Sequence, residues 1–426
     1  MAATGRGRPR APRALSLLLV LGLGLAACGG DAAGSGSTQL QWYVFEEPGG
    51  SFTSAAEACT EQSEGRYSIE IETLPSDADQ QREQLARRLA AGDTAIDIIG
   101  MDVIWTAEFA NAGWIVPWEG DRATKATEGR LDPAVQSATW QDTLWAAPFT
   151  SNAQLLWYRT DVVDEAPGTW TQLLDTAESL AEEDQPHLVQ VQGQRYEGLT
   201  VFFASLVASA GGQILGDDGA EVVLDREATI RALEVMQRLA TSEVAPPGLS
   251  TSLEDDNRLA FEAGDSAFMV NYPFVWPSAQ ENATKIAENM GWAQFPSLRE
   301  GEPSHVTIGG LNLGVSSTSE HQELAFEAAA CLAKPANQQQ AAVKGGLLPT
   351  TESLYEEQAV KDAFPFAEEL RSALQEAVQR PQTPAYADVS LAIARTIHPM
   401  RSIDPQADYE RLREALERAL RSEGLL

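Results

Sequence analysis

The sequence predicts an α/β protein that contains a parallel sheet covered by helices. Between residues 39 and 99, the apolar residues switch between a period of two, typical of strands, and a period near 3.6, typical of helices. Ten Trp, thirteen Phe and eight Tyr supply the bulky side chains of packed cores, which a disordered chain lacks. A length of 426 residues is sufficient for two or three domains.

The first elements follow one another as strand, helix, strand, helix and strand. The predicted ranges are 40–45, 67–74 and 95–99 for the strands, and 51–64 and 77–91 for the helices. The first helix opens at Ser51, a residue type that caps helices, and the second is followed directly by Gly92. Parallel sheets of this kind bind ligands beyond the carboxyl ends of their strands. We therefore expect Asp102 and Trp105, just after the third strand, at a binding site.

The rest of the chain continues the alternation of strands and helices. An extended, aromatic-rich segment covers 145–158, and a strand interrupted by glycines covers 306–316. Further predicted ranges are helices 171–182, 200–210, 226–241, 254–262 and 320–333, strand 267–271, and the proline-punctuated stretch 380–386 between helices of the tail. The sequence shows neither an internal repeat nor a long linker within the body.

The first residues predict an export signal. Four arginines precede an apolar run over 14–27, which is too short for an ordinary membrane-spanning helix of roughly twenty residues. The run ends in Leu25-Ala26-Ala27-Cys28, which resembles the lipobox of bacterial lipoproteins. We expect a signal peptide over 1–27, lipidation of Cys28 and a flexible tether over 28–38. A plain signal peptide with an incidental Cys28 is the alternative. The lipid would hold the protein on the outer face of the cytoplasmic membrane.

The charge of the chain excludes some partners. Thirty Lys and Arg against 62 Asp and Glu give a formal charge of −32, which repels nucleic acid and anionic membrane surfaces. A solvated acidic surface explains this charge more simply than an acidic substrate site does. Cys59 and Cys331 remain after lipidation, and they form either a disulfide or two separate buried thiols.

Motifs of catalysis and cofactor binding are missing from the sequence. It contains no Gly-x-Ser-x-Gly elbow, no His-Glu-x-x-His pair, no Walker loop and no Gly-x-Gly-x-x-Gly after a strand. Its four histidines, His187, His305, His321 and His398, lack the spacing of metal ligands. We therefore expect neither a cofactor nor a metal. Carboxylate pairs could serve a glycosidase, but 62 acids make such pairs inevitable.

Aromatic rings beside acids and amides point instead to sugar binding. The C–H faces of a sugar stack on such rings, and its hydroxyls are recognised by carboxylates, amides and guanidinium groups. Candidates at the predicted loop edges are Glu46 and Glu47, Asp102 with Trp105, Asn152, Glu254-Asp255-Asp256, and Tyr272-Pro273-Phe274 with Trp276. A site of this kind holds its ligand without a nucleophile.

Several runs resemble the extracellular solute-binding proteins of carbohydrate ABC importers and, within that family, the trehalose-binding lipoproteins of mycobacteria. The runs are EQLARRLAAGDTAIDIIGMDVIWTAEFANAGW (83–115), TSNAQLLWYRTD (150–161), SAGGQIL (209–215), RLAFEAG (258–264), NYPFVW (271–276), VTIGGLNLGVS (306–316) and GGLLP (345–349). The resemblance implies a type II, maltose-binding-protein-like fold of two lobes with hinge crossovers. Lobe 1 is expected over 39–148 and 307–345, and lobe 2 over 149–306 and 346–426. This division puts Cys59 and Cys331 in one lobe, which favours the disulfide.

The resemblance also implies ligand contacts and departures from the family pattern. The implied contacts are Asp102, Asn152, Glu254, Tyr272, Gly346 and Arg380. Tyr272 stands where the mycobacterial proteins have Trp, and Glu46 and Glu47 replace less acidic residues, which leaves their role open. The stretch between Tyr272 and Thr307 is several tens of residues shorter, and Met269 replaces an acid. Both changes bear on which disaccharide fits.

We therefore expect a lipid-anchored, monomeric receptor that captures a disaccharide, trehalose first, and delivers it to the permease and ATPase of an ABC importer. Lobe closure around the sugar would be the mechanism, without bond cleavage. The alternatives are a receptor for a maltose-type oligosaccharide or glucosylglycerol, a secreted glycosidase, and a receptor for a cation or polyamine. Arg380 disfavours the last of these, because a cation site would not recruit an arginine.

Overall fold

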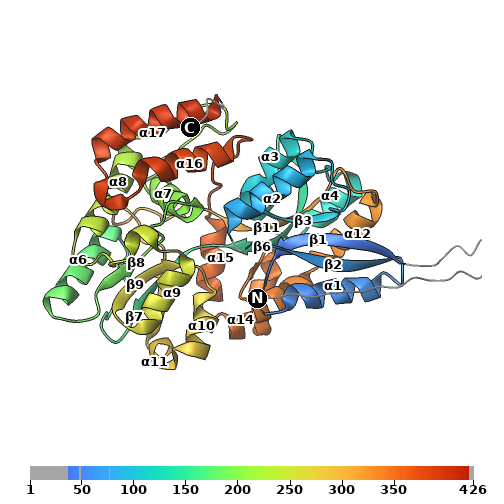
Figure 1. Ribbon diagram of the computed structural model, residues 1–426. Helices are drawn as coiled ribbons and strands as arrows, with labels where there is room; N and C mark the ends of the chain where they lie inside the picture. Colours follow the sequence, from blue (N-terminus) through green and yellow to red (C-terminus); the bar gives the residue numbers. More distant parts are fainter. Residues whose placement is uncertain (1–36, 48, 76, 422–426) are drawn as a thin grey trace, which may run out of the picture. The chain divides into compact units, whose positions relative to one another are not determined.

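A computed structural model describes residues 37–47, 49–75 and 77–421. The predicted signal peptide, Cys28 and most of the predicted tether lie outside these residues. Two sheets organise the described part, and both belong to the compact unit that begins at Ser37 (Figure 1).

The larger sheet has six strands and confirms the predicted parallel pairing at the start of the chain. Its strands are, in hydrogen-bonded order, β12 (Leu348–Pro349), β6 (Ala146–Asn152), β11 (Gly309–Val315), β3 (Ile98–Asp102), β1 (Thr38–Phe45) and β2 (Tyr67–Leu74). Strand β1 pairs in parallel with both β2 and β3. Strand β11, which comes much later in the chain, inserts between β3 and β6 and is antiparallel to both.

The third strand lies three residues later than the sequence predicts. The prediction placed it over 95–99, whereas β3 covers Ile98–Asp102, so Asp102 is the last residue of the strand. The carboxylate of Asp97 accepts hydrogen bonds from the backbone N–H of Gln41 and the hydroxyl of Ser319, which satisfies this buried charge before the strand begins. An apolar run alone does not distinguish strand residues from a buried approach to the strand.

The smaller sheet has four strands, in the order β10 (Met290–Gln294), β7 (Leu155–Arg159), β9 (Ser266–Asn271) and β8 (Leu188–Gln190). Strands β4 (Thr139–Trp140) and β5 (Thr143–Leu144) form a separate hairpin. After Tyr272 the chain forms the helices α10 (Val275–Asn282) and α11 (Thr284–Ala287) and then returns to the sheet as β10.

One apolar core packs on the six-stranded sheet, in the right half of Figure 1. Its helices are α1 (Ser51–Gln62), α2 (Ala78–Ala90), α3 (Thr106–Asn111), α4 (Gly120–Thr127) and α12 (Gln322–Leu332), with the 3₁₀ turn η1 (Val103–Trp105). A disulfide joins Cys59 of α1 to Cys331 of α12. It connects two helices that are far apart in sequence and adjacent in space.

The Ser cap predicted for α1 is wrong. The residue before the helix is Gly50 in the left-handed region, and its first turn is satisfied by the carboxylate of Glu47. This carboxylate accepts hydrogen bonds from the backbone N–H and the hydroxyl of Ser51, both at 2.6 Å. A carboxylate near a helix N-terminus is favoured both by the free N–H groups and by the helix dipole.

A second apolar core packs on the four-stranded sheet, in the left half of Figure 1. The helices around it or beside it are α5 (Asp132–Ser137), α6 (Trp170–Glu182), α7 (Glu197–Ser209), α8 (Arg226–Thr241), α9 (Glu254–Ala263), α10 (Val275–Asn282), α11 (Thr284–Ala287), α13 (Pro335–Gly345), α14 (Gln358–Ala363), α15 (Ala367–Gln375), α16 (Tyr386–Ile397) and α17 (Pro405–Leu420), with the turns η2 (Leu249–Thr251), η3 (Glu352–Glu356) and η4 (Met400–Ser402). Asp225 caps α8 by accepting a hydrogen bond from the N–H of Ala228, as expected of an acid at this position.

The chain passes between the two sheets more than once. It leaves the six-stranded sheet after Asn152 and enters the other at Leu155, and it returns between β10 and β11. After β12 it passes again to the helices of the second core. These passages bring the ends of β3 and β6 close to the first residues of α7 and α9, and this is where the site forms.

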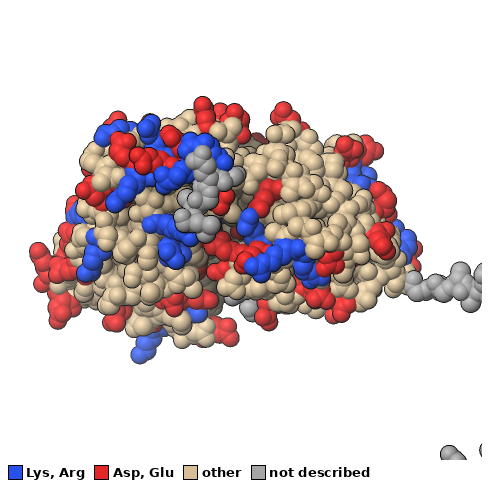
Figure 2. All heavy atoms as spheres, turned by 45° about the horizontal axis from the view of Figure 1, so that its top comes forward, with Lys and Arg blue, Asp and Glu red and all other residues tan. Residues whose placement is uncertain are grey.

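The acidity of the chain is spread over its surface. Figure 2 shows Asp and Glu across the visible face, interspersed with Lys and Arg. Within residues 37–47, 49–75 and 77–421, no helix has both the length and the apolar composition needed to cross a membrane.

Candidate functional site

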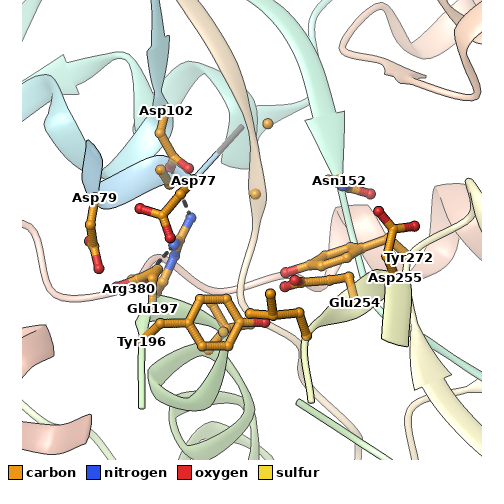
Figure 3. Close-up of a pocket in the computed structure, with 16 residues that line it drawn as sticks. Asp77, Asp79, Asp102, Asn152, Tyr196, Glu197, Glu254, Asp255, Tyr272 and Arg380 are labelled. Carbon is orange, nitrogen blue, oxygen red and sulfur yellow. Dashed lines mark hydrogen bonds and ion pairs between the residues drawn. The ribbon is translucent and has the colours of Figure 1, made fainter. Parts of the chain in front are cut away.

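A cavity of about 370 Å³ lies where the two cores meet. Five of the six ligand contacts that the family resemblance implies line it together (Figure 3). These are Asp102, Asn152, Glu254, Tyr272 and Arg380. The remaining lining residues are Asp77, Ala78, Asp79, Tyr196, Glu197, Gly198, Val201, Leu253, Asp255, Gly309 and Gly310.

Arg380 is the centre of a group of charges that we call the Arg380 cluster, formed by Asp102, Glu197 and Arg380. The guanidinium donates to Oε1 of Glu197 at 2.7 Å and to Oδ1 of Asp102 at 3.3 Å. It also donates to the backbone carbonyl of Ile308 at 3.2 Å. Asp102 comes from the end of β3 and Glu197 from the start of α7, so Arg380 connects the two cores.

Burial governs the protonation of this cluster. Arg380 is 6% exposed and Glu197 is 7% exposed. Burial raises the pKa of Glu197, and the positive charge of Arg380 and the hydroxyls of Ser390 and Tyr386 counteract that shift. Burial alone would lower the pKa of Arg380, but the charge of Asp102 and its other neighbours outweighs it, and the pKa is raised. Arg380 therefore stays protonated and paired.

Two tyrosines surround a carboxylate on the other side of the cavity, and we call Tyr196, Glu254 and Tyr272 the Glu254 cluster. Figure 3 shows Glu254 and Tyr272 together, opposite Asp102, with the ring of Tyr196 between them and Glu197. Burial raises the pKa of Glu254, and the nearby hydroxyl of Tyr196 partly offsets this. Burial and the charge of Glu254 raise the pKa of Tyr272 as well. The hydroxyl of Tyr196 is buried and, within the described residues, has no hydrogen-bond partner in good geometry.

Further acids surround the mouth of the cavity. Asp77 caps α2 by accepting from the N–H of Gln80, and Asp255 pairs with Arg258 at 3.0 Å. Asp79 is exposed to solvent, yet the protein around it raises its pKa to about 6, first through desolvation and then through the charges of Glu197 and Asp77. The carboxylates therefore repel one another across the cavity.

The wall between these groups comes from the paired strands β6 and β11. Asn152, the last residue of β6, faces Gly309 of β11. Gly310 has a φ of +125°, and a side chain there would meet the carbonyl oxygen of Thr150 at 2.2 Å. Only glycine fits this position, so a ligand has direct access to the backbone beside Asn152.

The other predicted ligand residues do not line this cavity. Trp105 is 1% exposed and stacks on Phe109 within the first core. Trp276 packs edge-on against Trp292 and Phe366 in the second core.

Three further predicted residues also lie away from the cavity. Gly346 ends α13 with a φ of +67°, where glycine is the favoured residue. Glu47 binds the start of α1, and Glu46 is exposed beside it after β1. The ligand roles of Glu46, Glu47, Trp105, Trp276 and Gly346 stay predictions.

Sequence reasoning missed several residues of the cavity. Tyr196 and Glu197 are the most important, because Tyr196 belongs to the Glu254 cluster and Glu197 to the Arg380 cluster. The predicted helix began at residue 200, whereas α7 begins at Glu197, so both residues were left in an unassigned loop. An acid in the first turn of a helix would have been a usable signal. Within the residues that the structure describes, no group of His, Cys, Asp and Glu could hold a metal ion.

Comparison with known proteins identifies the class of this site. The family described as bacterial extracellular solute-binding protein matches residues 45–339. The chain belongs to this family.

Individual relatives of this solute-binding protein agree with that assignment. A probable ABC transporter-binding protein of Deinococcus radiodurans is 27% identical over 325 residues, or 74% of this chain and 76% of that protein. The maltose-bound T. maritima MalE3 has a TM-score of 0.81 at 28% identity, over 89% of this chain and 99% of that one. The GacH receptor of Streptomyces glaucescens has a TM-score of 0.79 at 21% identity, over 90% and 99%, and is similar in fold.

These findings confirm the predicted fold class, a maltose-binding-protein-like type II fold. The relatives of this chain are solute-binding proteins. As a member of an extracellular solute-binding family, the protein faces the periplasm or the exterior.

Proposed function

We propose that the protein captures an α-linked glucose disaccharide, trehalose, in the cavity between its two cores. The observation that carries this proposal is the meeting of Asp102, Asn152, Glu254, Tyr272 and Arg380 at one cavity. They supply carboxylate and amide acceptors, guanidinium and amide donors and an aromatic face, which is what a sugar requires. The volume of about 370 Å³ lies in the range of small-ligand sites and suits two hexose rings better than a long oligosaccharide.

The proposed mechanism is closure of two lobes, 39–148 with 307–345 and 149–306 with 346–426. Asp102 lies at a strand end of the six-stranded sheet, in the first of these lobes, whereas Glu254 and Tyr272 belong to elements around the other sheet, in the second. A sugar that touches both sets is bound more tightly when the lobes are closed, so it shifts the population toward the closed state. The closed, loaded protein then delivers the sugar to the permease. No bond is broken.

We further propose that the protein is a monomer held at the membrane by lipid on Cys28. The support is the run that ends at Cys28 and the flexible composition of residues 29–37. Cell growth with a radiolabelled fatty acid should label the protein, and Cys28→Ser should lose both the label and the membrane association. Labelling that survives Cys28→Ser would contradict the anchor. Light scattering on the purified protein tests the monomer.

Maltose, or a short maltose-type oligosaccharide, is the second candidate ligand. The maltose-bound T. maritima MalE3, at a TM-score of 0.81 and 28% identity, favours it. Trehalose and maltose differ in the linkage between two glucose units, so the position of the second ring against Tyr272 and Asn152 decides between them.

Calorimetric titration with trehalose, maltose and glucose tests the proposed function. We expect saturable binding of trehalose, lost in Asn152→Ala, since this side chain lines the cavity at the end of β6. Glu410→Gln, an exposed site on α17, is the matched control and should bind like the wild type. Binding of maltose but not trehalose would select the second candidate. A folded protein that binds no sugar would contradict the proposed function.

A further inference from the structure

The positive charge in the cavity is already neutralised by carboxylates of the protein. Of the described residues that line the cavity, Arg380 alone is basic. Its guanidinium is paired with both Glu197 and Asp102. A ligand cation placed elsewhere in the cavity therefore does not face an uncompensated arginine. The presence of Arg380 thus gives no reason to exclude a positively charged ligand.

Glu254, in contrast, has no cationic partner. No Lys or Arg of the described chain forms an ion pair with it, although its neighbour Asp255 pairs with Arg258. Burial raises the pKa of Glu254, which means that the ionised form is unfavourable in the structure as it stands. A positive charge beside this carboxylate would stabilise its ionised form.

The surroundings of Glu254 suit an organic cation. The rings of Tyr196 and Tyr272 lie beside the carboxylate (Figure 3), and their negative π-faces attract a cation when water is excluded. The buried hydroxyl of Tyr196 lies beside Glu254 and could accept a hydrogen bond from an ammonium group. Two other polar groups, Asp102 and Asn152, line the same cavity and can bind the hydroxyls of a ligand.

We propose that the natural ligand of this cavity is an amine-bearing sugar, whose ammonium group lies against Glu254 and the rings of Tyr196 and Tyr272. The inference rests on the proposed function, because the same sugar must still place its hydroxyls against Asp102 and Asn152. It narrows the ligand from a neutral glucose disaccharide to an amino derivative. A simple polyamine has no hydroxyls for Asp102 and Asn152 and binds more weakly.

Matched ligands test this inference on the purified full protein. The probes are trehalose, maltose, spermidine and the aminotrehaloses. In each aminotrehalose an ammonium replaces the hydroxyl at carbon 2, 4 or 6. We expect at least one aminotrehalose to bind about tenfold or more tightly than trehalose at pH 7 and low salt. Added NaCl should weaken the binding of that aminotrehalose but leave the affinity for trehalose unchanged, because salt screens only interactions between charges.

The variant Glu254→Gln keeps the shape of the side chain and removes its charge. It should abolish the advantage of the amine over trehalose, whereas Glu410→Gln, with the same change of net charge on an exposed site of α17, should retain it. Circular dichroism of both variants shows whether they are folded.

Each outcome separates this inference from the proposed function. If trehalose or maltose binds and every aminotrehalose binds equally or less tightly, the inference is wrong and the proposed function stands. If the amine keeps its advantage in folded Glu254→Gln, the role of Glu254 is wrong. Tighter binding of spermidine than of any sugar would overturn both proposals, as would a folded protein that binds none of the probes.

Discussion

The two sides of the cavity differ in how well their charges are matched. In the Arg380 cluster, a buried guanidinium pairs with Glu197 at 2.7 Å and with Asp102 at 3.3 Å, and Tyr386 and Ser390 add hydrogen bonds to Glu197. In the Glu254 cluster, a part-buried carboxylate has no cationic partner among the described residues, and the hydroxyl of Tyr196 beside it makes no hydrogen bond of good geometry. A buried charge that is paired within the protein serves stability, whereas a buried charge without a partner is available to a charged ligand.

Removal of the arginine should have the largest effect on stability. Arg380→Met leaves Glu197 buried without its partner, so the free energy of unfolding should fall by about 3–5 kcal/mol. Urea denaturation followed by fluorescence measures this change. The double variant Arg380→Met, Glu197→Gln should recover part of the loss, because the unpaired charge is gone. A loss below about 1 kcal/mol in the single variant would show that the Arg380 cluster does not stabilise the fold.

Truncation on the other side of the cavity should affect sugar binding instead. Tyr272→Ala removes an aromatic face from the Glu254 cluster, and affinity for the bound disaccharide should fall about tenfold or more, since aromatic contacts contribute about 1–2 kcal/mol. Tyr272→Phe retains the face and should change the affinity by only a few-fold. Calorimetric titration compares the two variants, and equal losses would mean that the hydroxyl, not the ring, makes the contact.

Two tyrosine hydroxyls provide a matched comparison of the clusters. The hydroxyl of Tyr386 donates to Glu197, so Tyr386→Phe should lower the free energy of unfolding by about 1.5–3 kcal/mol, as for hydrogen bonds to charged groups. The hydroxyl of Tyr196 makes no hydrogen bond of good geometry in the described structure. Tyr196→Phe should therefore change the free energy of unfolding by less than about 0.5 kcal/mol or stabilise the protein. Thermal unfolding measures both, and similar losses would remove the distinction between the clusters.

The smallest effect concerns Asp79, whose pKa is raised to about 6 by desolvation and by the charges of Glu197 and Asp77. A carboxyl with a raised pKa binds its proton more tightly in the folded state, so its ionisation destabilises the fold above about pH 6. Below that pH, protonation progressively relieves the penalty. Asp79→Asn should therefore raise Tm at pH 8, on the order of 1 °C because the group is exposed, and the difference should vanish toward pH 4. A difference in Tm that stays constant from pH 4 to pH 8 would contradict the raised pKa of Asp79.

Local patterns predicted most of the fold. The strand β2 and the helix α8 have the predicted bounds, and the parallel order of the first three strands follows from their alternation with helices. Boundaries were less accurate where a long-range contact decides them. Strand β3 begins three residues late because Asp97 is held by Ser319, and α1 is capped by Glu47.

Part of the site was also accessible from the sequence. Asp102 could be placed because the carboxyl end of a parallel strand is where ligands bind. Asn152, Glu254, Tyr272 and Arg380 were placed through their resemblance to known motifs, and they line the same cavity. Tyr196 and Glu197 were missed, because no local pattern shows that the start of α7 approaches β3.

The sequence by itself determined the types of elements, their order and the acidic surface, because periodicity, capping and net charge depend on residues close together in the chain or on composition. Tertiary structure decided which polar groups are paired. Whether Arg380 is free or matched depends on Asp102, 278 residues away, and on Glu197, 183 residues away. Only the folded chain brings these three residues together, and only then does Glu254 emerge as the carboxylate left for a ligand.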